Sequence, residues 1–200
     1  AHPEEKAAAV VSVIVGAYNH ERYIAQALHS IIAQDAPFPI EVFVVEDAST
    51  DRTLDVIAGV QRSLDPDGNV SLTVLASPIN LNTNRTWRAT VQRTRGEFVA
   101  TLDGDDYWSD PHKLVRQVQL MRDRPEVAMC VHAADYLDDS TGEIFGRSEV
   151  GPDDMTLCDV VLGSSIPACS VLFRRSAVLE LPDFFDDAPS GDIITSVSAA

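Results

Sequence analysis

The feature of this chain that most limits its fold is a regular alternation of short apolar runs with stretches of helical periodicity. Runs rich in β-branched residues lie at 10–15, 40–45, 70–75 and 98–102. Between the first two runs, apolar residues recur at helical spacing at Ile24, Leu28 and Ile31. Continuous apolar runs of this length are typical of strands that are buried on both faces of a parallel sheet. The order of elements therefore predicts an α/β fold, with an open, mainly parallel sheet and helices on both faces.

The rest of the chain predicts further elements around this sheet. Helices are expected at 48–62, 82–95 and 110–121, and strands at 127–132, 143–145 and 166–173. The first of these helices follows Ser49, Thr50 and Asp51, and the third follows Asp110-Pro111, which are residues that favour helix starts. A turn is expected at 138–142, loops at 149–160 and 182–189, and a short final helix from Ser190.

Composition excludes several classes of function. The formal net charge of −16 argues against binding to nucleic acid or to an anionic membrane surface. The three cysteines lie far apart, so they suit neither a disulfide framework nor a zinc site and indicate a reducing compartment. With no apolar run of membrane-spanning length and no signal peptide in this sequence, a cytoplasmic location is expected. The 200 residues suit one domain at 10–200, with residues 1–9 as an N-terminal extension.

Polar residues follow three of the four apolar runs, at the point where each predicted strand ends. Asn19 follows the first run, Asp47 the second, and Asp103 and Asp105 the fourth. Ligands of open α/β sheets bind beyond the carboxyl ends of the strands. These side chains are therefore expected to converge on one rim of the sheet, although they are far apart in sequence.

The densest group on this rim is the acidic turn, residues 103–106, with three carboxylates in four positions. Neighbouring carboxylates raise the cost of ionising one another, and a divalent cation removes that cost. Carboxylate oxygens are the ligands that Mg²⁺ and Mn²⁺ prefer. Gly104 is expected to let the chain turn tightly enough for Asp103 and Asp105 to face one site. The alternative is a solvated acidic turn, but the following Tyr107-Trp108 pair and helix start favour a metal site.

Three motifs resemble, in combination and in order, those of the family 2 glycosyltransferases. They are VSVIVGAYN at 11–19, VEDASTD at 45–51 and LDGDDYW at 102–108. The resemblance covers the chain from about residue 10 to its end and implies a Rossmann-like GT-A fold. It also implies a nucleotide-binding part at 10–108 and an acceptor-side part, C-terminally truncated, at 109–200. One departure is Gly16, where the family more often has a proline that shapes the loop under the nucleotide.

The resemblance implies a role for each matching residue. The nucleotide would contact Ala17, Tyr18, Asn19, Asp47, Asp103 and Gly104. Within this set, Asp47 would accept a hydrogen bond from the nucleobase imide, although the start of the following helix also favours a carboxylate at this position. Asp105 and Asp103 would ligate a Mn²⁺ or Mg²⁺ ion that bridges the diphosphate. Asp106 is expected to fix the loop.

A second acidic position lies well downstream of the acidic turn. Family members carry an acid there, at the start of a helix that faces the acceptor, and Ser190-Gly191-Asp192 fits this place. An inverting transfer needs a base that takes the proton from the acceptor hydroxyl, so Asp192 is the expected catalytic residue. The alternative is that Asp192 only caps a helix.

The resemblance implies a metal-dependent, inverting transfer of a hexosyl or related sugar from a nucleotide-sugar donor, most commonly a UDP-sugar. The acceptor would be a glycan, a lipid-linked molecule or a small molecule, in glycan or polysaccharide synthesis, with the full-length protein peripheral to the membrane. The alternative is a non-catalytic sugar-nucleotide or glycan-binding module of the same fold. A haloacid-dehalogenase phosphatase would need Thr or Val where Trp108 stands. Dinucleotide-binding dehydrogenases and sugar nucleotidyltransferases need glycine-rich loops that the first strand lacks here.

Overall fold

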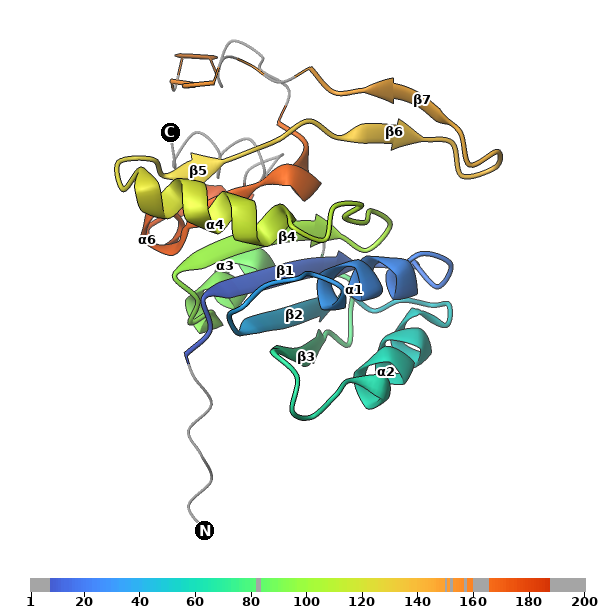
Figure 1. Ribbon diagram of the computed structural model, residues 1–200. Helices are drawn as coiled ribbons and strands as arrows, with labels where there is room; N and C mark the ends of the chain where they lie inside the picture. The colour runs from blue at the N-terminus through green and yellow to red at the C-terminus, as the bar shows by residue number, and fades with distance from the viewer. Residues whose placement is uncertain are drawn as a thin grey trace.

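The computed structural model describes residues 8–81, 84–149, 151, 153–156, 158–159 and 166–187. Its main feature is a six-stranded sheet in the order β3-β2-β1-β4-β8-β5 (Figure 1). The strands are β1 Val11–Ala17, β2 Ile40–Glu46, β3 Val70–Ala76, β4 Phe98–Asp103, β5 Met129–Cys130 and β8 Leu172–Arg174. The first four are parallel to one another, whereas β8 runs antiparallel to β4 and β5. The predicted α/β fold with a mainly parallel sheet is confirmed.

Helices cover both faces of this sheet (Figure 1). They are α1 Ile24–Ile32, α2 Thr53–Ser63, α3 Asn84–Arg93, α4 Lys113–Asp123 and the short α6 Arg175–Leu179. Because side chains of a strand alternate between faces, β1 contributes to two hydrophobic cores. Val13 and Val15 pack with residues of α1, α2 and α4, whereas Ile14 packs with Val91 of α3 and Val178 of α6.

The chain after α4 departs from the sequence expectation in several places. The strand expected at 166–173 is a 3-10 turn, η1 Ala168–Ser170, followed by the short β8. Ser170 donates from both its backbone N–H and its hydroxyl to the carbonyl of Pro167, at 2.9 and 2.7 Å, and such local bonds compete with strand pairing. The strand expected at 127–132 is reduced to β5. Neither α6 nor the 3-10 helix η2 Asp183–Asp187, inside the expected loop at 182–189, was predicted.

A separate hairpin projects from the body of the molecule (Figure 1). It consists of β6 Asp135–Leu137 and β7 Ile144–Arg147. The turn expected between them is confirmed, and Gly142 adopts a φ of 73° there, which glycine tolerates without strain. Asp139 in this turn accepts hydrogen bonds from Arg22 Nη2 at 2.9 Å and from the Tyr23 hydroxyl at 2.8 Å. The tip of the hairpin is therefore bonded to the segment that precedes α1.

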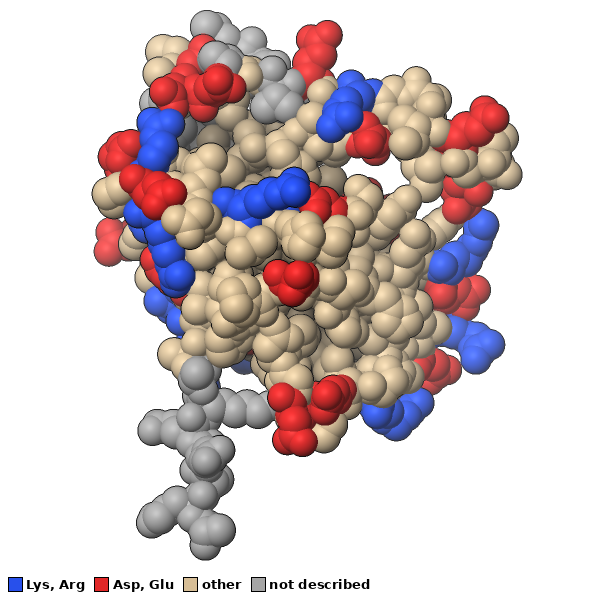
Figure 2. Space-filling view, in the orientation of Figure 1, with Lys and Arg blue, Asp and Glu red and all other residues tan. Residues whose placement is uncertain are grey.

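Charged side chains are distributed over the surface in mixed groups. Figure 2 shows acidic and basic residues beside one another around a broad area that carries few charges. Ion pairs on the surface include Arg122 with Glu97 at 2.7 Å and Arg116 with Asp110 at 2.8 Å. Among the described helices, none combines the length and the apolar character that crossing a membrane requires.

Candidate active site

A cavity of about 350 Å³ lies at the carboxyl edge of β1, β2 and β4. These three strand ends are adjacent because Gly16 of β1 pairs with Val45 of β2 on one side and with Asp103 of β4 on the other. The cavity lining includes four of the predicted nucleotide-binding residues and two residues that were not predicted: Ala17, Tyr18, Asp47, Asp103, His20 and Trp87. The convergence expected from the sequence is therefore present for these strand ends.

The loop after β1 is bonded to the loop after β2. Asn19 and Ala48 have φ values of 56° and 59°, in the left-handed region that asparagine tolerates better than most residues. The backbone N–H of Asn19 donates to the Ser49 hydroxyl at 3.0 Å, and its side-chain Oδ1 accepts from the Thr50 N–H at 2.8 Å. Asn19 is not among the described residues that line the cavity. Its side chain instead holds the two loops together.

Asp47 lies directly after β2 and borders the cavity. Its N–H donates to the carbonyl of Ala17 at 3.0 Å, and its Oδ1 accepts from the N–H of Leu81 at 2.7 Å. The first turn of α2 is served by another carboxylate, since Asp51 Oδ1 accepts from the Thr53 N–H at 2.9 Å. These contacts tie Asp47 to the cavity wall, and Asp51 supplies a further carboxylate at the start of α2.

The acidic turn begins at the last residue of β4. Asp103 borders the cavity, and its carbonyl accepts from the N–H of Asp106 at 3.0 Å, which closes the turn. Asp105 exposes 54% of its side chain, and its Oδ2 lies 3.8 Å from Nε2 of His20. His20 itself lines the cavity. The carboxylates of Asp103 and Asp105 therefore both lie at or beside the cavity.

Gly104 is required for a different reason from the one expected. It is buried, and its φ lies outside the left-handed region, so the turn does not need a glycine for backbone freedom. The Gly104 N–H donates to the carbonyl of Gly16 at 2.7 Å. A Cβ at position 104 would lie 2.6 Å from Nδ1 of His20 and 2.8 Å from the Gly16 oxygen. Glycine is needed because the turn packs this closely against the chain after β1.

The donor atoms at the acidic turn suit a divalent cation that is also held by a ligand. Within the described parts of the chain, no group of three or more His, Cys, Asp or Glu side chains is arranged to hold a metal ion. Mg²⁺ is often bound through one or two carboxylates, with substrate phosphates and water completing its coordination. Asp103 and Asp105 fit this pattern, and they do not form a complete metal site on their own.

Asp106 and Trp108 are not among the described residues that line the cavity, and both contact Cys169 of η1, the turn before β8. Burial of the Asp106 carboxyl, and then the charge of Asp105, raise the pKa of Asp106, while a hydrogen bond with Cys169 opposes this. Burial and the same carboxylate raise the pKa of the Cys169 thiol to about 12. Trp108 is buried and donates from Nε1 to the Cys169 carbonyl at 2.8 Å. These contacts agree with the loop-fixing role expected for Asp106 and make Trp108 a core residue.

A family model described as Glycosyl transferase family 2 matches residues 12–180. This chain belongs to glycosyl transferase family 2. An uncharacterized glycosyltransferase of Nostoc sp. is 34% identical over 178 residues, which cover 85% of this chain and 52% of that protein. The crystal structure of Staphylococcus aureus TarS 1–349 with UDP-GlcNAc shares its fold, with a TM-score of 0.67 and 22% identity over 95% of this chain and 53% of that one. The structure of the Pyrobaculum calidifontis mannosyltransferase PcManGT with GDP-Man and Mn²⁺ also shares it, with a TM-score of 0.62 and 21% identity over 88% of this chain and 49% of that one. The chain spans about half the length of each of these three chains.

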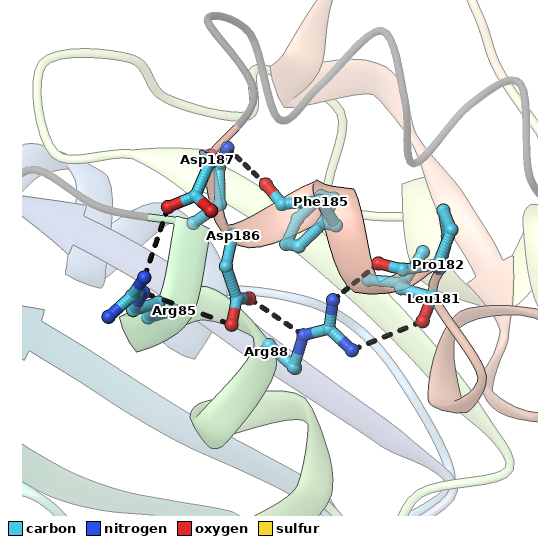
Figure 3. Close-up of polar contacts among 8 residues, drawn as sticks. Arg85, Arg88, Leu181, Pro182, Phe185, Asp186 and Asp187 are labelled. Atoms are coloured by element: carbon cyan, nitrogen blue, oxygen red, sulfur yellow. Dashed lines mark hydrogen bonds and ion pairs between the residues drawn. The ribbon is translucent and has the colours of Figure 1, made fainter.

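In this family 2 domain, helix α3 contributes Asn84, Thr86 and Trp87 to the cavity lining and is bonded to η2. Figure 3 shows Arg85 and Arg88 of α3 reaching toward η2. Arg88 donates to Asp186 Oδ1 at 2.8 Å and to the carbonyls of Leu181 and Pro182 at 3.1 and 2.6 Å. Asp192, the predicted catalytic base, lies outside the described residues. The described residue closest to it in sequence is Asp187, whose carboxylate pairs with Arg85 at 3.0 Å.

His20 and Trp87 are two of the cavity residues of this family 2 domain that were not predicted as site residues. His20 directly follows the Ala17-Tyr18-Asn19 motif, so its place in the same loop was a usable signal. Trp87 lies within the helix expected at 82–95, and no site role was predicted for it. Its ring lies 5.8 Å from that of Phe185 and also lines the cavity. Nothing in its sequence spacing indicates that it lines the cavity.

Proposed function

We propose that this domain transfers a sugar from a nucleoside-diphosphate donor to an acceptor hydroxyl, with the help of a divalent cation. The observation that carries the proposal is the single cavity that has Asp47 at the end of β2, Asp103 at the end of β4 and Asp105 beside it. A nucleoside diphosphate has a neutral, hydrogen-bonding base at one end and a charged diphosphate at the other. The family membership and the ligands of the two similar crystal structures, UDP-GlcNAc and GDP-Man, support this donor class.

The residues of the cavity divide between the two ends of such a donor. Ala17, Tyr18 and Asp47 would contact the base, and Asn19 would act indirectly by holding their loops together. Asp103 and Asp105 would hold Mn²⁺ or Mg²⁺. The cation would neutralise the negative charge of the diphosphate, both in the bound donor and in the nucleoside diphosphate that leaves. Without the cation these carboxylates would repel the phosphates. The donor is proposed to be a UDP-sugar, and the transfer to be inverting.

A thermal-shift titration with UDP and GDP, in Mn²⁺ or in EDTA, tests the binding half of the proposal. A nucleotide at about 100 times its Kd should stabilise the protein by about 2.7 kcal/mol, and clearly less in EDTA. Asp105→Asn should lose the part of this stabilisation that depends on Mn²⁺. Without ligand, its melting temperature should equal that of wild type. Asp123→Asn, at the exposed end of α4, is the matched control and should behave like wild type. Equal stabilisation in Mn²⁺ and EDTA would show that the metal role is wrong.

Catalysis is proposed to use Asp192 as the base that deprotonates the acceptor hydroxyl. Asp192→Asn in the full-length protein should lower the transfer rate by about two to four orders of magnitude and leave nucleotide affinity unchanged. A residue that only caps a helix would instead cost about 1 kcal/mol of stability and leave the transfer rate nearly the same. A wild-type protein that binds a nucleotide-sugar but neither transfers nor hydrolyses it would favour the non-catalytic binding module.

A further inference from the structure

His20 lies between the two halves of the proposed donor site. Its backbone N–H donates to the Thr53 hydroxyl at 2.7 Å. Its carbonyl accepts from the N–H groups of Tyr23 and Ile24 at 3.0 and 2.9 Å, which begins α1. The residue is thereby fixed both to the start of α2 and to the start of α1. Its side chain borders the cavity and is 22% exposed.

The His20 ring occupies the space that a side chain at position 104 would fill. The ring nitrogen Nδ1 would lie 2.6 Å from a Cβ on Gly104. Real carbon atoms do not approach a nitrogen this closely, so the ring and the acidic turn can adopt this arrangement only with a glycine there. The loop after β1 and the acidic turn are therefore in direct side-chain contact through this one residue.

Among the described residues, neither ring nitrogen of His20 has a hydrogen-bond partner. Nδ1 is buried and has no partner among them, and a buried polar group without a partner is unfavourable. Nε2 lies 3.8 Å from Oδ2 of Asp105, which is longer than a hydrogen bond. A movement of about 1 Å would bring this pair to hydrogen-bond distance. The ring therefore lies beside the carboxylate that is proposed to hold the cation, close enough to bond to it after a small movement.

We propose that His20 is a positioning residue that orients the Asp105 carboxylate through its ring N–H. The inference rests on the proposed function, because it assigns a partner to a proposed metal ligand. Hydrogen-bond partners of metal ligands fix the ligand's orientation, and removing them typically lowers metal affinity by about 10- to 100-fold. The loop of His20 is also bonded to the loop of Asp47 through Asn19.

The test measures how much Mn²⁺ improves the affinity for UDP and GDP, compared with EDTA, in matched variants. His20→Leu keeps a side chain of similar volume but removes the N–H, whereas His20→Gln keeps a donor. His29→Leu, an exposed histidine on α1, is the control. Uridine and guanosine serve as probes without phosphate, and their affinity should not change in any variant. The Mn²⁺ gain is the ratio of nucleotide affinity in Mn²⁺ to that in EDTA. We expect this gain to be about tenfold or more smaller in His20→Leu than in wild type. It should be largely restored in His20→Gln and equal to that of wild type in His29→Leu.

The outcomes separate this inference from the proposed function. A wild-type protein without any Mn²⁺ gain would overturn the proposed metal role and, with it, the inference. A complete Mn²⁺ gain in His20→Leu would overturn the inference alone. An equal loss in His20→Leu and His20→Gln would mean that ring packing rather than the N–H matters, which also contradicts the proposal. Melting temperatures of all variants establish that the fold is retained.

Discussion

Gly104 is the residue at which a single added carbon atom has the most direct consequence for the site. In Gly104→Ala the new Cβ would meet the Gly16 carbonyl at 2.8 Å and the His20 ring at 2.6 Å. Because the Gly16 oxygen belongs to β1 and cannot rotate away, the acidic turn must shift. We expect a loss of about 1–3 kcal/mol in the free energy of unfolding and a weaker response to Mn²⁺.

Urea unfolding and nucleotide titration check this prediction. Gly59→Ala is the control, because a Cβ at Gly59 of α2 meets no atom within 4 Å and alanine favours helix. This control should match or exceed wild-type stability. A Gly104→Ala protein with wild-type stability and an unchanged Mn²⁺ response would contradict the close packing of the turn.

Lys113 makes stability depend on pH. Its side chain is 5% exposed, it donates to Gln117 Oε1 at 2.7 Å, and burial lowers its pKa from 10.5 to about 7. Between these two pKa values the unfolded chain holds a proton that the folded protein lacks, so the stability contributed by this group rises with pH. It rises by at most about 1.4 kcal/mol per pH unit, and it is constant below the folded pKa.

Lys113→Met removes this titration. The free energy of unfolding of wild type, measured relative to Lys113→Met, should therefore increase from about pH 6 to about pH 9. Urea unfolding of both proteins across this range is the measurement. Arg116→Met, on the exposed side of the same helix, should show a difference from wild type that does not change with pH. A constant difference for Lys113→Met as well would show that the buried lysine keeps its ordinary pKa.

At the scale of elements, the contact between α3 and η2 depends on one arginine more than on its neighbour. The Arg88 side chain is 22% exposed and donates to Asp186 and to two carbonyls, whereas the Arg85 side chain is 65% exposed. We expect Arg88→Met to lower the free energy of unfolding by about 2–4 kcal/mol, because it leaves these acceptors unpaired. Arg85→Met should cost about 0–1 kcal/mol.

Chemical unfolding of the two variants side by side is the measurement for this element. Each variant removes one arginine from the same helix face, so the net charge changes equally in both. Similar losses for Arg85→Met and Arg88→Met would mean that surface charge, rather than the bonds to the Leu181 and Pro182 carbonyls, holds η2 in place.

The elements that could be predicted are those with a strong local signal. The strands from β1 to β4 and helices α1, α2 and α4 are long, periodic and flanked by helix-start or turn residues, so their sequence pattern is sufficient. The elements β8, α6 and η2 are short and depend on distant partners. Arg174 at the end of β8, for example, donates to the Met121 carbonyl of α4 at 2.8 Å. No local pattern reports such a contact.

The same distinction applies to the candidate site. Ala17, Tyr18, Asp47 and Asp103 lie at strand ends or directly after them, and the rule that strand ends converge was enough to group them at one cavity. Asn19 belongs to the same motif, but its side chain faces the neighbouring loop because its backbone is left-handed. That orientation follows from the loop's conformation, which residue type alone does not determine.

At the scale of the whole molecule, the excess of negative charge should affect cation binding. The net charge is −16, although basic groups are interspersed on the face in Figure 2. The screening length falls from about 30 Å at 0.01 M salt to about 10 Å at 0.1 M, so distant carboxylates attract a cation only at low salt. We expect Mn²⁺ affinity to fall by about an order of magnitude between these salt concentrations.

Titration of Mn²⁺ at a series of NaCl concentrations measures this effect. The affinity for uridine, which carries no charge, should stay the same over the series and serves as the control. A Mn²⁺ affinity that does not depend on salt would mean that only the carboxylates in contact with the ion determine its attraction.

The place of β8 in the sheet has a consequence for biosynthesis. β4 pairs with β8 through Phe98, Val99 and Ala100, but β8 is made from residues 172–174, long after β4 has been synthesised. Until then one side of this apolar strand has no hydrogen-bonding partner, and such open edges recruit strands from other chains. The strand that carries the acidic turn is therefore vulnerable to aggregation on the ribosome until nearly the whole domain has emerged.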